Sequence, residues 1–369
     1  MTRLRRCLLC ALLAAAGCAD GPPDGSLRRL ATPAAPYASG VTVLAEQVAV
    51  LQLPAPPRHL VLSDAALYVF LNRHGLATLD LSDPARPRLA HWLQGAMAND
   101  DQRGHHFLNG ILEPERARLV VADRSQGITF IDVSQPLAPR VERTIEFPGD
   151  LPTAILPDGN GYYVAGGGRG LFHLAEGWSE GGPIKPVLTD FDHVKDLRWL
   201  APNLLVFSDH VQNGLQVLDV SRRDAPRALA LFSLRQYCDS LQVIGQMVAL
   251  QVRELGVVLV NLEKPERPWI QSVLPTGGIS SLTCMARWGE HRLLVGDTAG
   301  TIQILDLEDQ ARPCWVGRIL ARSSIACLET RGDLLYVGLN HEPAAEAIRP
   351  GHQFAVYRLT ARRVSDPEG

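Results

Sequence analysis

The chain has 369 residues, 46% of them hydrophobic and 20% charged, with a formal net charge of -3 at pH 7. This length is ample for a large apolar core. The balance of 36 basic and 39 acidic residues, without a basic stripe interleaved with aromatic residues, argues against a nucleic-acid partner.

The first residues have the pattern of an export signal. MTRLRR is basic, CLLCALLAAA is apolar but too short to span a bilayer, and small residues end at Cys18. Residues 1–17 therefore resemble the signal peptide of bacterial lipoproteins. That resemblance implies lipidation of Cys18 and a membrane anchor, and Ala19 after it implies the outer membrane. The alternative is ordinary signal cleavage, which would release a soluble secreted protein.

The segment after the cysteine does not have the pattern of a folded domain. Residues 18–40 are rich in Pro, Gly, Ala and small polar residues and show no apolar period, so we predict a flexible tether. The folded domain is predicted over residues 41–363, and residues 364–369 are predicted to be a disordered tail.

One phrase recurs along the folded part. GLATLDLSDPARPRL begins at Gly75, GITFIDVSQPLAPRV at Gly127 and GLQVLDVSRRDAPRAL at Gly214. Related glycines occur at 170, 256, 300 and 351, and four of the six spacings lie between 42 and 44 residues. A period of this length indicates a repeat array in which neighbouring units bury each other's faces.

Each repeat contains four short segments rich in Val, Ile and Leu and bounded by turn formers, which indicates β-strands. Four strands in about 43 residues predict an all-β protein, a seven-bladed β-propeller of four-stranded antiparallel blades. The last repeat lacks a fourth strand, and residues 41–54 precede the first complete repeat. We therefore predict that this N-terminal strand pairs with residues 353–359 and completes the last blade. Six or eight blades are the alternatives.

The repeated letters are explained by turn chemistry. The glycine tolerates a positive φ between the second and third strands. Short oxygen-bearing side chains near the end of the third strand can accept hydrogen bonds from backbone N–H groups that have left the sheet. These are Asp80, Asp132, Asp219 and Asp306. The phrase is thus interpreted as structural and not catalytic.

The recurring GL-x-V-x-DVS-x-P unit resembles the LVIVD repeat family of β-propellers, which is common among exported and surface-attached bacterial proteins. The resemblance covers residues 57–359 and is clearest in the first, second and fourth repeats. It implies the fold and export, and it implies no single reaction.

Candidate site residues lie in the loops that lead into the innermost strand of each blade. Five polar side chains are candidates for a binding site on the rim of the central channel: His105, His106, Asp192, His193 and Asp239. Imidazole and carboxylate groups together can bind a divalent metal. The alternative is an ordinary solvated rim. No residue is assigned as catalytic or as a metal ligand, and no cofactor is predicted, because GxSxG, HExxH and phosphate-loop motifs are missing.

Two further features leave alternatives open. Of the cysteines outside the export segment (Cys238, Cys284, Cys314 and Cys327), Cys284 and Cys327 fall on neighbouring inner strands and are either a disulfide or two buried thiols. The insertions 95–106 and 341–352 widen the first and last spacings and are candidate partner-binding loops.

Together these observations predict a monomeric, lipid-anchored propeller that acts as a non-enzymatic binding or scaffold protein of the bacterial cell envelope. Its location is predicted as the outer membrane, facing the periplasm or the surface, and its partner as a protein or an envelope component. One alternative is a metal-dependent hydrolase that uses the His/Asp rim. Another is an outer-membrane assembly factor.

Overall fold

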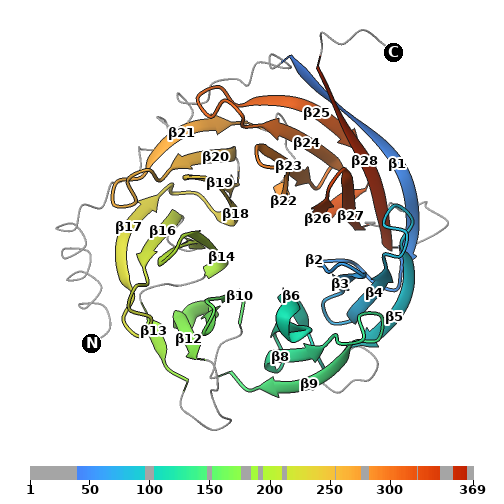
Figure 1. Ribbon diagram of the computed structural model, residues 1–369. Helices are drawn as coiled ribbons and strands as arrows, with labels where there is room; N and C mark the ends of the chain where they lie inside the picture. The colour runs from blue at the N-terminus through green and yellow to red at the C-terminus, as the bar shows by residue number, and fades with distance from the viewer. Residues whose placement is uncertain are drawn as a thin grey trace. The chain divides into compact units, whose positions relative to one another are not determined.

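A computed structural model of the chain confirms the predicted fold class, a seven-bladed β-propeller of four-stranded antiparallel blades (Figure 1). The structure describes residues 40–95, 104–147, 152–175, 184–189, 194–209, 214–253, 255–275, 282–321, 323–340 and 352–363. In each of the first six sheets the four strands are adjacent in chain order, as expected for short repeats.

The first three blades follow one another from His59. Blade 1 consists of β2 (His59–Leu62), β3 (Ala66–Phe70), β4 (Gly75–Asp80) and β5 (Arg88–Gln94). Blade 2 consists of β6 (Phe107–Glu113), β7 (Arg118–Asp123), β8 (Gly127–Asp132) and β9 (Arg140–Ile145), with the 3-10 turn η2 (Pro114–Arg116) between β6 and β7. Blade 3 consists of β10 (Ala154–Pro157), β11 (Gly161–Ala165), β12 (Leu171–Ala175) and β13 (Pro186–Leu188), with η3 (Gly167–Arg169) between β11 and β12.

The remaining blades have the same strand order. Blade 4 consists of β14 (Val194–Ala201), β15 (Leu204–Asp209), β16 (Gly214–Asp219) and β17 (Arg227–Ser233). Blade 5 consists of β18 (Cys238–Ile244), β19 (Met247–Val252), β20 (Gly256–Asn261) and β21 (Trp269–Leu274). Blade 6 consists of β22 (Leu282–Trp288), β23 (Arg292–Asp297), β24 (Thr301–Asp306) and β25 (Cys314–Leu320). Blade 7 consists of β26 (Ser324–Arg331), β27 (Leu334–Asn340), β28 (His352–Arg363) and β1 (Val41–Leu53).

The chain divides into two compact units. The smaller unit includes Lys185–Gly277 and therefore blades 4 and 5. Its core joins the two blades through Val206 and Val217 of blade 4 and Leu241 and Val258 of blade 5. A polar contact accompanies this packing, because the backbone N–H of Leu241 donates to Asp196 Oδ2 at 3.2 Å.

The larger unit includes Ala34–Val164 and Gly278–Gly369 and holds blades 1, 2, 6 and 7. Their innermost strands are neighbours in the order β22, β26, β2 and β6. Middle strands such as β3 are buried along their whole length, because their apolar side chains face the blades on both sides. Full burial of each large apolar side chain stabilises the fold by about 1.5–3 kcal/mol.

Blade 7 combines the two ends of the folded chain (Figure 1). The pairing runs from Val41 opposite Arg363 to Leu53 opposite His352, with one bulge between Gln47 and Ala49. The predicted completion of the last blade by the N-terminal strand is thereby confirmed. A side-chain hydrogen bond also joins the two strands, because Tyr357 Oη donates to Gln47 Oε1 at 3.2 Å.

The predicted turn chemistry is also confirmed. Asp80 Oδ1 accepts a hydrogen bond from the backbone N–H of Ser82 at 2.8 Å. The same bond recurs after the third strand of blades 2, 4 and 6 at 2.8–2.9 Å. At Gly127 the φ angle is +116°, and an added Cβ would lie 2.2 Å from the carbonyl oxygen of Ile145. Glycine is therefore required there both by conformation and by the approach of β9.

Within the described ranges, no helix is both long enough and apolar enough to cross a membrane.

Candidate binding site at the turns of blades 1 and 2

Two of the predicted rim residues, His105 and His106, lie directly before β6. The last residue of β7, Asp123, is opposite the first residue of β6, Phe107. A second link comes from blade 1, where Asn72 forms a β-bridge with Phe107. The His105–His106 loop is therefore held between the β3–β4 turn of blade 1 and the β7–β8 turn of blade 2.

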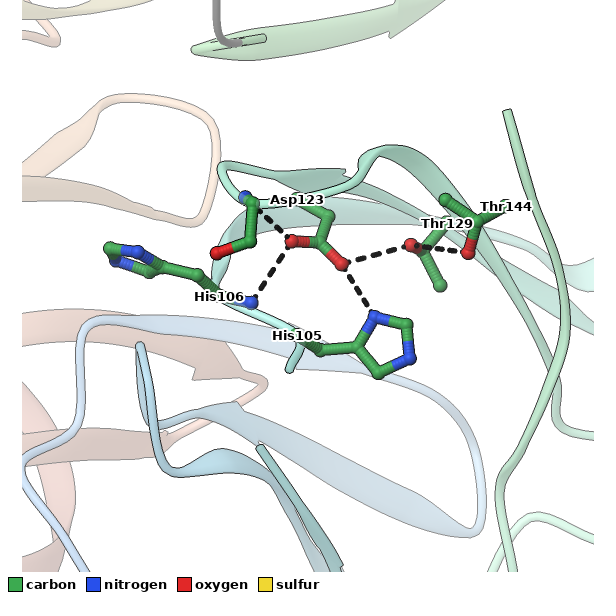
Figure 2. A network of polar contacts seen from close by, with 6 residues as sticks. His105, His106, Asp123, Thr129 and Thr144 are labelled. Atoms are coloured by element: carbon green, nitrogen blue, oxygen red, sulfur yellow. Dashed lines mark hydrogen bonds and ion pairs between the residues drawn. The ribbon is translucent and has the colours of Figure 1, made fainter. Parts of the chain in front are cut away.

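Asp123 is the centre of the hydrogen bonds that fix this loop (Figure 2). Its Oδ2 interacts with His105 Nδ1 at 2.6 Å and accepts from Thr129 Oγ1 at 3.1 Å. Its Oδ1 accepts from the backbone N–H groups of His106 at 2.9 Å and Ser125 at 3.0 Å. Since a carboxylate offers about four acceptor positions, those of Asp123 are filled.

The charge state of Asp123 follows from this arrangement. The side chain is fully buried, and burial by itself raises the pKa of a carboxyl group. The hydrogen bonds from His105 and from the backbone of His106 and Ser125 outweigh burial and hold the pKa of Asp123 below its ordinary value. Asp123 is therefore an ionised structural anchor whose oxygens are already used.

The two histidines differ although they are adjacent. Figure 2 shows their imidazole rings pointing in opposite directions from the loop. The His105 ring bonds to Asp123 and stacks on Phe107 with ring centroids 5.0 Å apart. The His106 side chain has no such role: it is only 6% exposed, and its Nε2 has no hydrogen-bond partner within the part of the chain that the structure describes.

Three arginines lie on backbone segments close to His106. Arg73 follows Asn72, the partner of Phe107, and the backbone N–H of Arg124 donates to the His106 carbonyl at 2.8 Å. Arg58 lies directly before β2, and its backbone N–H donates to the carbonyl oxygen of Phe70 at 2.8 Å. Burial first, and then the positive charges of Arg124, Arg73 and Arg58, lower the pKa of His106 below its ordinary 6.5. His106 is thus neutral at pH 7.

The three arginines were not predicted from the sequence, although a signal was present. Arg73 lies two residues before Gly75 and Arg124 three residues before Gly127, so both fall in the turn between the second and third strands of successive repeats. Repeats that each place a cation in this turn place both cations at the same end of neighbouring blades. All three arginines are exposed, and no ion pair joins their guanidinium groups to any carboxylate in the described ranges.

The other predicted rim residues have different outcomes. Asp239 is the second residue of β18 in the smaller unit and forms an ion pair with Arg253 at 3.4 Å. The guanidinium group of Arg253 lies 5.1 Å from the centre of the Tyr237 ring. Asp192 and His193 lie outside the described residues, as do most of the two candidate loops at 95–106 and 341–352.

A second polar cluster lies at the opposite end of β6 and β7. Arg118 Nε donates to Glu113 Oε2, a second Arg118 nitrogen donates to Tyr162 Oη, and Tyr162 Oη donates to Glu113 Oε1, each at 2.7 Å. The guanidinium also lies 4.8 Å from the centre of the Phe130 ring. Burial and the negative charge of Glu113 raise the pKa of Tyr162 to about 12. This closed set ties blade 2 to β11 of blade 3.

The candidate metal ligands and the cysteines give two further results. Among the side chains that the structure describes, no group of three or more His, Cys, Asp and Glu residues is arranged to hold a metal ion. Of the two alternatives for Cys284 and Cys327, the structure has free thiols. Burial raises the pKa of Cys284 to about 12 and that of Cys327 well above its ordinary value.

Neither a protein-family model nor a curated protein sequence matches the chain. Solved structures do match its fold. The RRP9 WD40 repeats superpose with a TM-score of 0.65 at 15% identity, over 88% of this chain and 99% of theirs. U3-55K gives a TM-score of 0.65 at 14% identity with the same coverage. The chain is thus a β-propeller of the architecture found in WD40 repeats, and at these identities the likeness concerns the fold alone.

Proposed function

We propose that this protein is a lipid-anchored, non-enzymatic binding propeller of the bacterial cell envelope. One observation carries the non-enzymatic part. His105 of the predicted rim bonds to Asp123, and Asp123 has four donors. A general base or a metal ligand needs a free lone pair, and this carboxylate has none, so Asp123 serves to hold the loop.

The choice of a protein or envelope partner is supported by the class of fold. Propellers present turns from many blades on one rigid framework, which suits recognition of a macromolecule. The exposed arginines beside His106 provide polar groups for such a contact. A monomer suffices for this role, because the single chain completes its own last blade.

Export and anchoring are supported by the sequence of residues 1–18, and metabolic labelling tests them. The full chain is expressed in a bacterial host fed an alkyne fatty acid. We expect the wild type to take up the label and to fractionate with the outer membrane, and Cys18→Ser to lose both properties. The matched control is Cys10→Ser, which removes a thiol from the apolar part of the signal and retains the label. An unlabelled wild type would contradict the anchoring.

Binding and catalysis are distinguished by two measurements on the anchored protein. Crosslinking in native membranes, followed by affinity purification, is expected to recover a protein in stoichiometric amount. Metal analysis of the purified chain tests the hydrolase alternative. Stoichiometric bound metal that disappears in His193→Ala, but not in the control His291→Ala, would favour the enzyme and contradict this proposal.

A further inference from the structure

The cluster of Arg58, Arg73, Arg124 and His106 has the composition of an anion site. Its three arginines lie at one end of two neighbouring blades that are joined by backbone contacts at Asn72 and Phe107, Arg58 directly before β2 and Arg73 and Arg124 in turns between second and third strands. The acidic side chain at this end of these elements is Asp123, whose oxygens are filled by donors from its own blade. Its single negative charge offsets only part of the three positive charges, so the described residues leave a local excess of positive charge.

His106 provides the second, independent observation. A buried polar atom without a partner destabilises a fold by about 1–3 kcal/mol, so it commonly marks a place where a partner arrives. The Nε2 of His106 is such an atom, in a side chain that is 94% covered. A neutral imidazole carries one N–H, and donation from Nε2 to an arriving oxygen would satisfy this group.

From this geometry we propose that the turns of blades 1 and 2 bind a carboxylate-bearing, acidic segment of a protein partner through Arg58, Arg73, Arg124 and His106. The proposal rests on the proposed binding function and names the chemistry of its partner. The planar fork of arginine matches a carboxylate through two parallel hydrogen bonds. Several carboxylates spaced along an extended peptide could then contact guanidinium groups on adjacent turns.

Net charge gives the proposal a specific form. The whole chain carries -3, so an acidic peptide gains nothing from the overall charge of the protein. Binding of such a peptide must come from a local cluster. It must also weaken with salt, since the Debye length falls from about 30 Å at 0.01 M to about 8 Å at physiological ionic strength.

Fluorescence anisotropy with labelled hexaglutamate tests the site on the full chain. The test variant replaces Arg58, Arg73 and Arg124 by Ala. The control replaces Arg86, Arg267 and Arg312 by Ala, which are exposed arginines at turns between third and fourth strands. Both variants change the net charge equally. We expect saturable binding by the wild type, at least tenfold weaker binding by the test variant, and less than a twofold change in the control.

A second variant probes the histidine. His106→Phe keeps a ring of similar shape and removes Nε2, and we expect a severalfold loss of hexaglutamate affinity with a normal circular dichroism spectrum. Should the variant fail to fold, nitrogen NMR of His106 in the wild type serves instead, with the Nε2 resonance expected to shift on addition of hexaglutamate. An unmoved resonance under saturating peptide would overturn the part assigned to His106.

The remaining outcomes are decisive. Equal weakening of both triple variants would reduce the effect to net charge and overturn the proposal. Binding to phosphatidylglycerol vesicles without binding to hexaglutamate would also overturn it, in favour of a membrane contact. If hexaglutamate fails while crosslinking still recovers a protein, this site is wrong and the proposed function stands. If crosslinking recovers none, the proposed function itself fails.

Discussion

The two ends of strands β6 and β7 hold polar clusters that solve different structural problems. At one end Asp123 is fully buried, and its hydrogen-bond partners come from blade 2 itself. At the other end Glu113 and Arg118 are 16% and 15% exposed and share Tyr162 of blade 3. The first cluster fixes a loop, and the second joins two blades. Of these two carboxylates, the one that is completely buried is the one whose oxygens all have donors in its own blade.

The largest effect is expected from Asp123→Ala. It removes the partner of His105, Thr129 and two backbone N–H groups at once, and we expect a loss of about 3 kcal/mol in the free energy of unfolding. Urea denaturation at pH 7 measures it. Asp132→Ala, which removes a partly exposed carboxylate in the same blade, is the control. Similar midpoints for both variants would show that the buried network contributes nothing special.

Arg118→Ala should have the second largest effect. Two hydrogen bonds and the contact with Phe130 disappear, and we expect a loss of about 2 kcal/mol. Because the positive charge of Arg118 lowers the pKa of Tyr162, its removal should raise that pKa further above about 12. Ultraviolet titration of the phenol checks this. Arg143→Ala removes only a contact over the same Phe130 ring, at 4.4 Å, and should leave the Tyr162 titration unchanged.

A smaller effect is expected from the pH dependence that His106 confers. Its pKa is lower in the folded protein than the ordinary 6.5, so the unfolded chain binds the proton more readily. The stability that this group provides is complete above pH 6.5 and is lost as the pH falls through the folded pKa. We expect His106→Gln to have a flatter stability profile below pH 6.5 than the wild type. Parallel profiles for the two proteins would show that His106 is not held neutral.

The smallest effect is expected from Asp80→Ala. It removes one exposed turn hydrogen bond from the backbone N–H of Ser82, at 2.8 Å, and we expect a loss of about 0.5 kcal/mol in the free energy of unfolding. Thermal melting followed by circular dichroism would measure the shift. A loss as large as that of Asp123→Ala would mean that the turn aspartates, and not the buried network, are the main polar contribution to blade stability.

The fold was predictable from the sequence because its signals are local and repeated. Gly127 and Asp80 each indicate a turn within a few residues of their own position. Because such turns recur at a regular spacing, the order of the strands in each blade follows from them. Pairing of residues 41–53 with 352–363 was predictable for a different reason. The last repeat lacked its fourth strand, and only one unassigned strand was available.

The site was only partly predictable. His105 and His106 were recognised as polar residues before an inner strand, but their opposite directions depend on the backbone of that loop. The partner of His105, Asp123, comes from the neighbouring strand and resembled an ordinary turn residue in the sequence. The arginines around His106 come from two blades, and their grouping requires the bridge between Asn72 and Phe107. The spacing of residues within a repeat does not indicate which side chains it brings close to those of the next repeat.

The pairing of the N-terminal strand β1 with the C-terminal strand β28 in blade 7 has a consequence for biosynthesis. Gln47 and Tyr357 are 310 positions apart in the chain and meet in the same sheet. At translation rates of roughly 5–20 residues per second, β1 leaves the ribosome tens of seconds before its partner exists. During that interval Leu44 and Val50 of β1 belong to no sheet. A chaperone that shields this segment would therefore act on the nascent chain early, and a protein truncated before β28 would lose the contribution of both of its ends at once.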